Sequence, residues 1–200
     1  MLNQKIRVHW DRYMRPVGRA VARTGVSPDA ITLGGVAVQG YAAYLILEGH
    51  LFLAALASTF AALSDVFDGA VAKAQNRAGK FGALLDSTTD RLGDALVFLP
   101  IAWLYGVSPD IVERDEPWVA VVALVALVAS FLVSYVKARA ESLGYRCDVG
   151  IAERAERLIA IILALAFDVV PVVITILAAL SIVTFVQRLL YVRAQDSRAS

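Results

Sequence analysis

The sequence has 200 residues, which suffices for one domain or two. Hydrophobic residues make up 58% of it and the mean hydropathy is +0.65, which excludes an ordinary soluble protein. The formal net charge of +1 gives no electrostatic basis for binding nucleic acid. A single cysteine, Cys147, excludes an intrachain disulfide and a cysteine-based zinc site.

The first 25 residues have the pattern of an interfacial helix. Apolar residues such as Leu2, Ile6 and Trp10 recur at helical spacing, with lysines and arginines between them. This predicts a basic amphipathic helix at 1–25, lying in the lipid headgroup region. Gly25 ends the helix, and Ser27 and Pro28 are a typical start for the next one.

Six further segments are predicted to span a membrane, because each offers about 20 mostly apolar residues. They cover 28–48, 51–72, 81–105, 118–140, 151–170 and 171–193. The fifth is the weakest, since Glu153, Arg154, Glu156 and Arg157 occupy its first turns. The sequence therefore predicts an all-α integral membrane protein, with the interfacial helix at 1–25, a six-helix transmembrane domain at 26–195 and a cytoplasmic tail at 196–200.

The charges predict the orientation of these spans. Basic residues concentrate in the N-terminal segment, in the connections after the second and fourth spans and in the C-terminal tail, which a six-span layout puts on one side. Acidic residues dominate the opposite side, where Arg114 is the only basic residue. Because positive charge marks the cytoplasmic side, both termini are predicted to be cytoplasmic.

Two pairs of aspartates stand at the cytoplasmic ends of neighbouring spans. Asp65 and Asp68 are three residues apart in the second span, and Asp86 and Asp90 are four apart in the third, so each pair shares a helix face. Asp94 follows one turn later. Ionised aspartates in a membrane helix cost several kcal/mol unless they are compensated. Shared Mg²⁺ or Mn²⁺ would compensate them, since hard cations prefer oxygen ligands.

The simpler alternative is that these carboxylates are solvated at the membrane interface. Arg91 directly follows Asp90 and is therefore expected to point elsewhere, so it does not neutralise the cluster. Four aspartates at paired helical spacing on consecutive helices favour a metal site over this alternative.

Residues 65–90 resemble the CDP-alcohol phosphotransferase signature. Asp65, Asp68, Gly69 and Ala72 are followed, after Lys73 and eight further residues, by Gly82, Asp86 and Asp90. The fixed positions of the family pattern D-x2-D-G-x2-A-R-x8-G-x3-D-x3-D are all matched except one, where Lys73 replaces arginine. Lysine keeps the charge and loses the bidentate donor. The resemblance covers nearly the whole chain, and the family's six-span topology agrees with the predicted spans.

The resemblance implies an enzyme at the cytoplasmic side of the plasma membrane. Two metal ions would be held by Asp65, Asp68, Asp86 and Asp90, and Asp90 would also act as the general base. Contacts with a CDP-linked lipid would come from Pro28, Asp29, Ala30, Ile31, Gly69, Lys73, Gly79 and Gly82. The family is commonly dimeric, which implies a homodimer.

The segments 81–91, 134–141 and 153–157 are similar to those of a subfamily that joins CDP-diacylglycerol and inositol phosphate, the actinobacterial phosphatidylinositol-phosphate synthases. This similarity implies that Ser134, Lys137, Arg154, Arg157 and Arg193 bind the acceptor phosphate. Ordinary anchoring to anionic lipid is the alternative for any single arginine. Glycerol 3-phosphate is the alternative acceptor, as in phosphatidylglycerophosphate synthases.

Two hypotheses from other classes of protein fit the sequence less well. An ion-coupled transporter would place carboxylates at the bilayer midplane, commonly within internal repeats, whereas these acids lie near span boundaries and no repeat is visible. A structural membrane subunit would leave the paired aspartates without a role. Metal-dependent release of CMP separates the enzyme from both.

Overall fold

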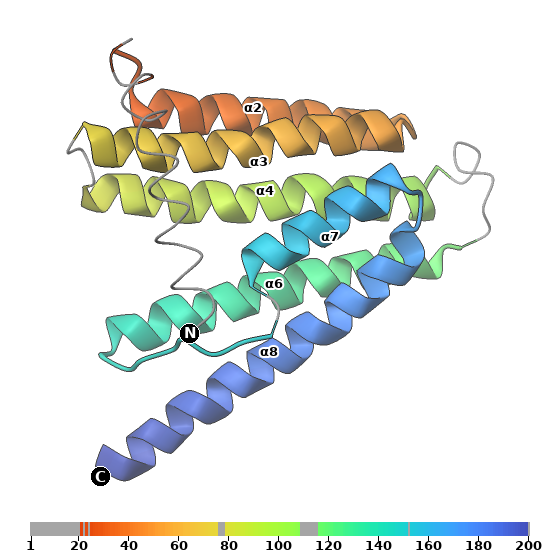
Figure 1. The fold of residues 1–200 in the computed structure, drawn as a ribbon. Coiled ribbons are helices and arrows are strands. Elements are labelled where there is room, and N and C mark those ends of the chain that lie inside the picture. The colour runs from red at the N-terminus through yellow and green to blue at the C-terminus, as the bar shows by residue number, and fades with distance from the viewer. Residues whose placement is uncertain are drawn as a thin grey trace. The chain divides into compact units, whose positions relative to one another are not determined.

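The computed structural model describes residues 21, 23, 25–75, 79–108, 116–151 and 153–199. Most of the predicted interfacial helix at 1–25 lies outside these residues, as do Arg77 and Arg114. The described residues form helices and no strand (Figure 1). The helices are α2 (Pro28–Leu47), α3 (Leu51–Ala74), α4 (Lys80–Gly106), α6 (Trp118–Ser142), α7 (Arg154–Ala166) and α8 (Val170–Ala199).

These helices confirm the predicted all-α membrane architecture. Four of them, α2, α3, α6 and α8, are long and apolar enough to cross a membrane by length and composition. The other two match the remaining predicted spans in position. α4 has 27 residues but carries the charged residues Asp86, Asp90, Arg91 and Asp94 between its start and its middle turns. α7 has only 13 residues, about 20 Å of helix against an apolar layer of about 30 Å.

Two helices, α7 and α8, differ most from the predicted spans. α7 is shorter than 151–170 because Glu153 is extended (ψ 170°) and Asp168 has a positive φ of 54°, so helical geometry ends on both sides. α8 begins at Val170 and continues to Ala199, so residues 196–199 of the predicted tail extend the last helix. Arg188, Arg193 and Asp196 therefore all lie on one continuous helix, α8.

The chain divides into two compact units, and the division falls inside α2, α3 and α4. One unit comprises Met1–Tyr41 and Ala57–Gly93, and the other comprises Ala42–Leu56 and Asp94–Ser200. We call the first the aspartate unit, because it contains Asp65, Asp68, Asp86 and Asp90. We call the second the arginine unit, because it contains Arg154, Arg157, Arg188 and Arg193.

In the aspartate unit, small and polar residues join α2 to α3. A Cβ on Gly35 would lie 3.0 Å from the Cβ of Ser64, so the two backbones approach closely there. Gln39 Nε2 donates to Ser58 Oγ at 3.3 Å, and Gln75 Nε2 donates to the Val26 carbonyl at 3.0 Å. These contacts hold α2 against residues 58–75, the stretch that carries Asp65 and Asp68.

In the arginine unit, α6 and α8 lie side by side and α7 packs against α8 (Figure 1). The buried side chains are mainly aliphatic and aromatic, as Phe98, Leu104, Val119 and Leu165 illustrate. The start of α6 approaches the end of α4 so closely that a Cβ on Gly106 would lie 2.9 Å from the Cβ of Ala120. Buried polar residues of α8, including Thr184 and Arg188, interrupt this apolar interior.

Candidate active site

Asp68 is the most firmly held of the four predicted metal ligands. It is buried in the last third of α3 and accepts a hydrogen bond from Thr32 Oγ1 at 2.6 Å through its Oδ2 atom. The backbone amide of Gly69 also donates to this carboxylate. Two donors therefore fix the direction of the Asp68 side chain, and Thr32 is a contributor that the sequence pattern did not indicate.

Two further aspartates lie near Asp68. The charges of Asp65 and Asp86 act on it electrostatically, which places α3 and the start of α4 within reach of one another at these positions. Asp65 is half-buried and Asp86 is exposed. The structure thus brings three of the four predicted ligands into one neighbourhood of the aspartate unit.

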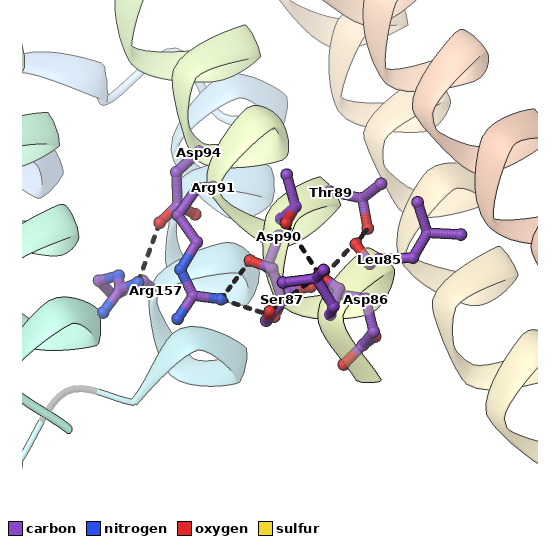
Figure 2. A network of polar contacts seen from close by, with 10 residues as sticks. Leu85, Asp86, Ser87, Thr89, Asp90, Arg91, Asp94 and Arg157 are labelled. Carbon is purple, nitrogen blue, oxygen red and sulfur yellow. Dashed lines mark hydrogen bonds and ion pairs between the residues drawn. The ribbon is translucent and has the colours of Figure 1, made fainter. Parts of the chain in front are cut away.

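Asp90 has a cationic neighbour on its own helix. Its Oδ2 atom lies 3.7 Å from Nη1 of Arg91, and the same nitrogen donates to the carbonyl of Ser87 (Figure 2). The expectation that Arg91 points elsewhere was wrong. The long arginine side chain bends back by one helical turn to the Ser87 carbonyl, and this brings its guanidinium beside Asp90.

The donor set suits a hard divalent cation, because it consists of carboxylates with neither histidine nor cysteine. Among the described residues, no group of three or more His, Cys, Asp or Glu side chains is gathered closely enough to hold a metal ion. Asp68 has Thr32 as a protein partner, and Asp90 has Arg91. Convergence of all four on shared cations therefore stays a prediction.

The residues predicted to contact a CDP-linked lipid flank these aspartates. A Cβ on Gly69 or on Gly82 would meet nothing within 4 Å, so both positions border open space. Gly79 is exposed. Lys73 lies within α3, and its side chain is not among those that the structure describes. At the start of α2, Pro28 is buried and Asp29 is exposed.

The amides at the start of α2 already have acceptors in the chain. Ala30 N donates to Ser27 Oγ at 3.2 Å, and Ile31 N donates to the Ser27 carbonyl at 3.3 Å. Ser27 is therefore the cap of α2, as the sequence predicts. A ligand that used these amides would compete with this cap.

In the arginine unit, Arg157 is buried and forms an ion pair. It is 2% exposed, and its Nη2 atom lies 3.1 Å from Oδ2 of Asp94 (Figure 2). The sequence showed Asp94 as the third acid of an i, i+4 series in α4 but gave no indication of its partner. Asp94 therefore orients a residue that is predicted to bind the acceptor phosphate.

The other predicted acceptor-binding residues lie on three helices, Ser134 and Lys137 on α6, the half-buried Arg154 on α7 and Arg193 on α8. Lys137 Nζ lies 3.9 Å from Glu141 and 4.0 Å from Asp148, and Ser134 is half-buried one turn before it. Arg193 of α8 lines a cavity of about 430 Å³ with Tyr135 and Arg139. Ser134 and Lys137 are not in the wall of that cavity. The structure thus groups Arg193 with Arg139.

Comparison with known proteins shows which protein family the chain resembles. The model for CDP-alcohol phosphatidyltransferases matches residues 25–190. The chain is 38% identical to the phosphatidylinositol phosphate synthase of Mycolicibacterium smegmatis, over 94% of this chain and 86% of the relative. It is 40% identical to the protein of the same name from Corynebacterium glutamicum, over 88% and 82% respectively.

Solved structures agree with these sequence matches. The phosphatidylinositol phosphate synthase of Mycobacterium tuberculosis with CDP-DAG bound has a TM-score of 0.81 and 36% identity, covering 90% of this chain and 94% of that one. The structure of the same protein with manganese and citrate has a TM-score of 0.80 and 35% identity, covering 90% and 88%.

Proposed function

This chain belongs to the CDP-alcohol phosphatidyltransferase family, and on that premise we propose that it transfers the phosphatidyl group of CDP-diacylglycerol to inositol phosphate. The products are phosphatidylinositol phosphate and CMP. The similarity to phosphatidylinositol phosphate synthases over 94% of the chain is the observation that carries the choice of acceptor. The intact aspartate motif supports the type of reaction.

The reaction exchanges one phosphorus–oxygen bond for another. The acceptor hydroxyl oxygen attacks the phosphorus that carries diacylglycerol, the bond from this phosphorus to the oxygen of CMP breaks, and CMP leaves with the bonding electrons. Asp90 takes the hydroxyl proton as the acceptor attacks. Because an ordinary aspartate has a pKa near 3.9, it is a weak base and depends on a hydroxyl that is held in line and acidified.

Asp65, Asp68, Asp86 and Asp90 would hold two divalent cations, Mg²⁺ or Mn²⁺. Bound there, the cations would neutralise the diphosphate and the charge of the departing CMP. The Thr32 hydrogen bond to Asp68 supports this assignment, because it fixes the direction of the carboxylate. The manganese in a structure of a relative agrees with these hard oxygen ligands.

The CDP end of the lipid would lie along the part of the aspartate unit that contains Gly69, Gly79 and Gly82. Open space at Gly69 and Gly82 supports the close approach of a diphosphate to the backbone. Lys73, Gly79 and the first turn of α2, residues 28–31, complete the proposed contacts. Lys73 would supply a point charge in place of the family's forked arginine.

The acceptor phosphate would be bound by Ser134, Lys137, Arg154, Arg157 and Arg193. The ion pair with Asp94 fixes the direction of the Arg157 guanidinium, and a guanidinium held in one direction is suited to binding an anion. Lys137 has exposed acidic neighbours that a stronger anion could displace, because exposed ion pairs are worth about 0–1 kcal/mol.

Orientation and assembly are part of the proposal. The distribution of basic residues supports a plasma-membrane protein with its active site and both termini in the cytoplasm. Because Cys147 is the only cysteine, labelling of K80C and H50C on a C147A background from either side of the membrane tests this orientation. Light scattering of the purified protein tests the proposed homodimer.

An acceptor panel with CMP release as readout tests the function. Purified protein with Mg²⁺ or Mn²⁺ and CDP-diacylglycerol is supplied with inositol phosphate, glycerol 3-phosphate or free inositol. We expect inositol phosphate to give the highest kcat/KM and free inositol to give little activity. Preference for glycerol 3-phosphate would overturn the acceptor and leave the reaction type in place. Release of CMP that persists in a chelator would overturn the metal-dependent reaction.

A further inference from the structure

The connection between α6 and α7 is held along its backbone by one face of α8. Thr184 Oγ1 accepts from Ile151 N at 3.3 Å, and Arg188 Nε donates to the Val149 carbonyl at 2.9 Å. Gln195 bonds both the amide and the carbonyl of Arg146, at 3.0 and 2.7 Å. Thr184, Arg188 and Gln195 are spaced four and seven residues apart, so they share one face of the helix.

Arg188 is the centre of this face. It is 5% exposed, and its Nη1 atom also donates to the carbonyl of Val133 in α6 at 2.7 Å. One side chain therefore ties α6, α8 and the connection together. Burying a guanidinium costs several kcal/mol unless its N–H groups find hydrogen-bond acceptors. The carbonyls of Val133 and Val149 are these acceptors, so a shift of either carbonyl would be unfavourable.

Gly150 shows how closely the connection is seated on α8. Its φ of +149° is a conformation that residues with side chains rarely adopt. A Cβ there would lie 2.8 Å from Cγ2 of Thr184 and 3.5 Å from Nη2 of Arg188. Cys147, three residues earlier, is fully buried. The connection consequently has little room to shift without moving Thr184 or Arg188.

The two carbonyls that Arg188 binds belong to the segments that carry the residues proposed to bind the acceptor phosphate. Val133 immediately precedes Ser134, and Val149 precedes α7, whose first turns carry Arg154 and Arg157. We propose that Arg188, supported by Thr184 and Gly150, is a positioning residue that sets the placement of Ser134, Arg154 and Arg157 for binding the acceptor phosphate. The inference rests on the proposed function of these three residues, and Arg188 itself need not touch the substrate.

The test separates a positioning role from a general structural one through the two Michaelis constants. In Arg188→Met the carbonyls of Val133 and Val149 lose their donor. We expect the acceptor KM to rise by up to about 10²-fold, the loss that a misplacement of about 1 Å can cause. The KM for CDP-diacylglycerol should change by less than about twofold. Arg188→Lys, which keeps a donor, should restore part of the acceptor affinity.

Two further variants make the result decisive. Ser197→Ala removes an exposed hydrogen bond within α8, from Ser197 Oγ to the Ala194 carbonyl, and should leave both constants unchanged. Gly150→Ala keeps Arg188 but pushes the connection away from Thr184, so its acceptor KM should also rise.

Equal losses toward both substrates, unchanged acceptor KM in both R188M and G150A, or failure of both variants to fold would overturn the positioning role. The acceptor KM is measured with whichever phosphorylated acceptor the wild type prefers. A wild-type preference for glycerol 3-phosphate would thus refute the proposed acceptor and still allow the Arg188 experiment to succeed or fail separately.

Discussion

The aspartate unit and the arginine unit hold their polar residues in different ways. In the aspartate unit, several polar side chains bond to their own helix, as Arg91 does to Ser87 and Thr88 to Leu84. Asp86 is exposed and Asp65 and Asp90 are half-buried. In the arginine unit, Arg157 and Arg188 are almost fully buried and bind residues 63 and 55 positions away.

This difference separates residues that act directly from residues that are held in place. Partly exposed carboxylates can exchange protein partners for cations and substrate. Buried arginines depend on particular acceptors, because an unpaired buried charge costs several kcal/mol. Substitutions in the aspartate unit should therefore alter the chemical step or the metal requirement, and substitutions in the arginine unit should alter acceptor affinity.

Asp90→Asn should have the largest effect. An amide accepts no proton at neutral pH, so loss of the proposed general base should lower kcat by about 10²- to 10⁴-fold, measured as CMP release. Asp168→Asn is a matched control, because Asp168 is exposed and asparagine tolerates its φ of 54°. If Asp90→Asn keeps the wild-type melting temperature and a near-normal kcat, the general-base role is refuted.

Asp94→Asn should have the next largest effect. It removes the charge that holds Arg157, and breaking a buried pair at one partner costs about 3–5 kcal/mol in stability or in function. We expect the KM for inositol phosphate to rise by about one to two orders of magnitude, with little change in the KM for CDP-diacylglycerol. An unchanged acceptor KM would mean that Arg157 has only a structural role.

Asp148→Asn is the exposed counterpart of this variant. It removes a 4.0 Å contact with Lys137, and the Asp148 side chain is 80% exposed. Because exposed pairs contribute about 0–1 kcal/mol, the acceptor KM should stay within about fivefold of the wild-type value. An effect as large as that of Asp94→Asn would contradict the contrast between buried and exposed pairs.

The same contrast explains what the sequence could predict. Helical spacing and charge indicated the membrane helices and the four aspartates, because periodicity and the cost of membrane charge are local properties of a sequence. The Arg157–Asp94 pair and the hydrogen bond from Arg188 to the Val133 carbonyl join residues more than 50 positions apart, and no local pattern encodes such a pairing. The error at Arg91 had another cause, since residue spacing gives the direction of Cβ and not the reach of a long side chain.

Thr32→Val should have an intermediate effect within the aspartate unit. Valine has nearly the shape of threonine but lacks the hydroxyl that donates to Asp68 at 2.6 Å. Hydrogen bonds to charged groups are worth about 1.5–3 kcal/mol, so the Mg²⁺ concentration for half-maximal CMP release should change by about tenfold or more. Thr88→Val removes only an exposed bond to Leu84 and should leave this concentration unchanged. Equal behaviour of the two variants would contradict a role for Thr32 in holding Asp68.

Gly69→Ala should have a smaller effect than Thr32→Val and tests where the substrate approaches. An alanine Cβ at position 69 meets nothing within 4 Å, and Gly→Ala within a helix stabilises by about 0.5–1 kcal/mol, so the melting temperature should stay equal or rise. If a diphosphate lies against this backbone, the KM for CDP-diacylglycerol should nevertheless rise several-fold.

Gly35→Ala is the converse of Gly69→Ala in the same unit. Its Cβ would lie 3.0 Å from Ser64, so the melting temperature should fall because α2 and α3 are forced apart. An unchanged CDP-diacylglycerol KM in Gly69→Ala would place the nucleotide elsewhere. A fall in melting temperature for Gly35→Ala alone, together with a raised KM for Gly69→Ala alone, would show that one glycine serves helix packing and the other serves the ligand.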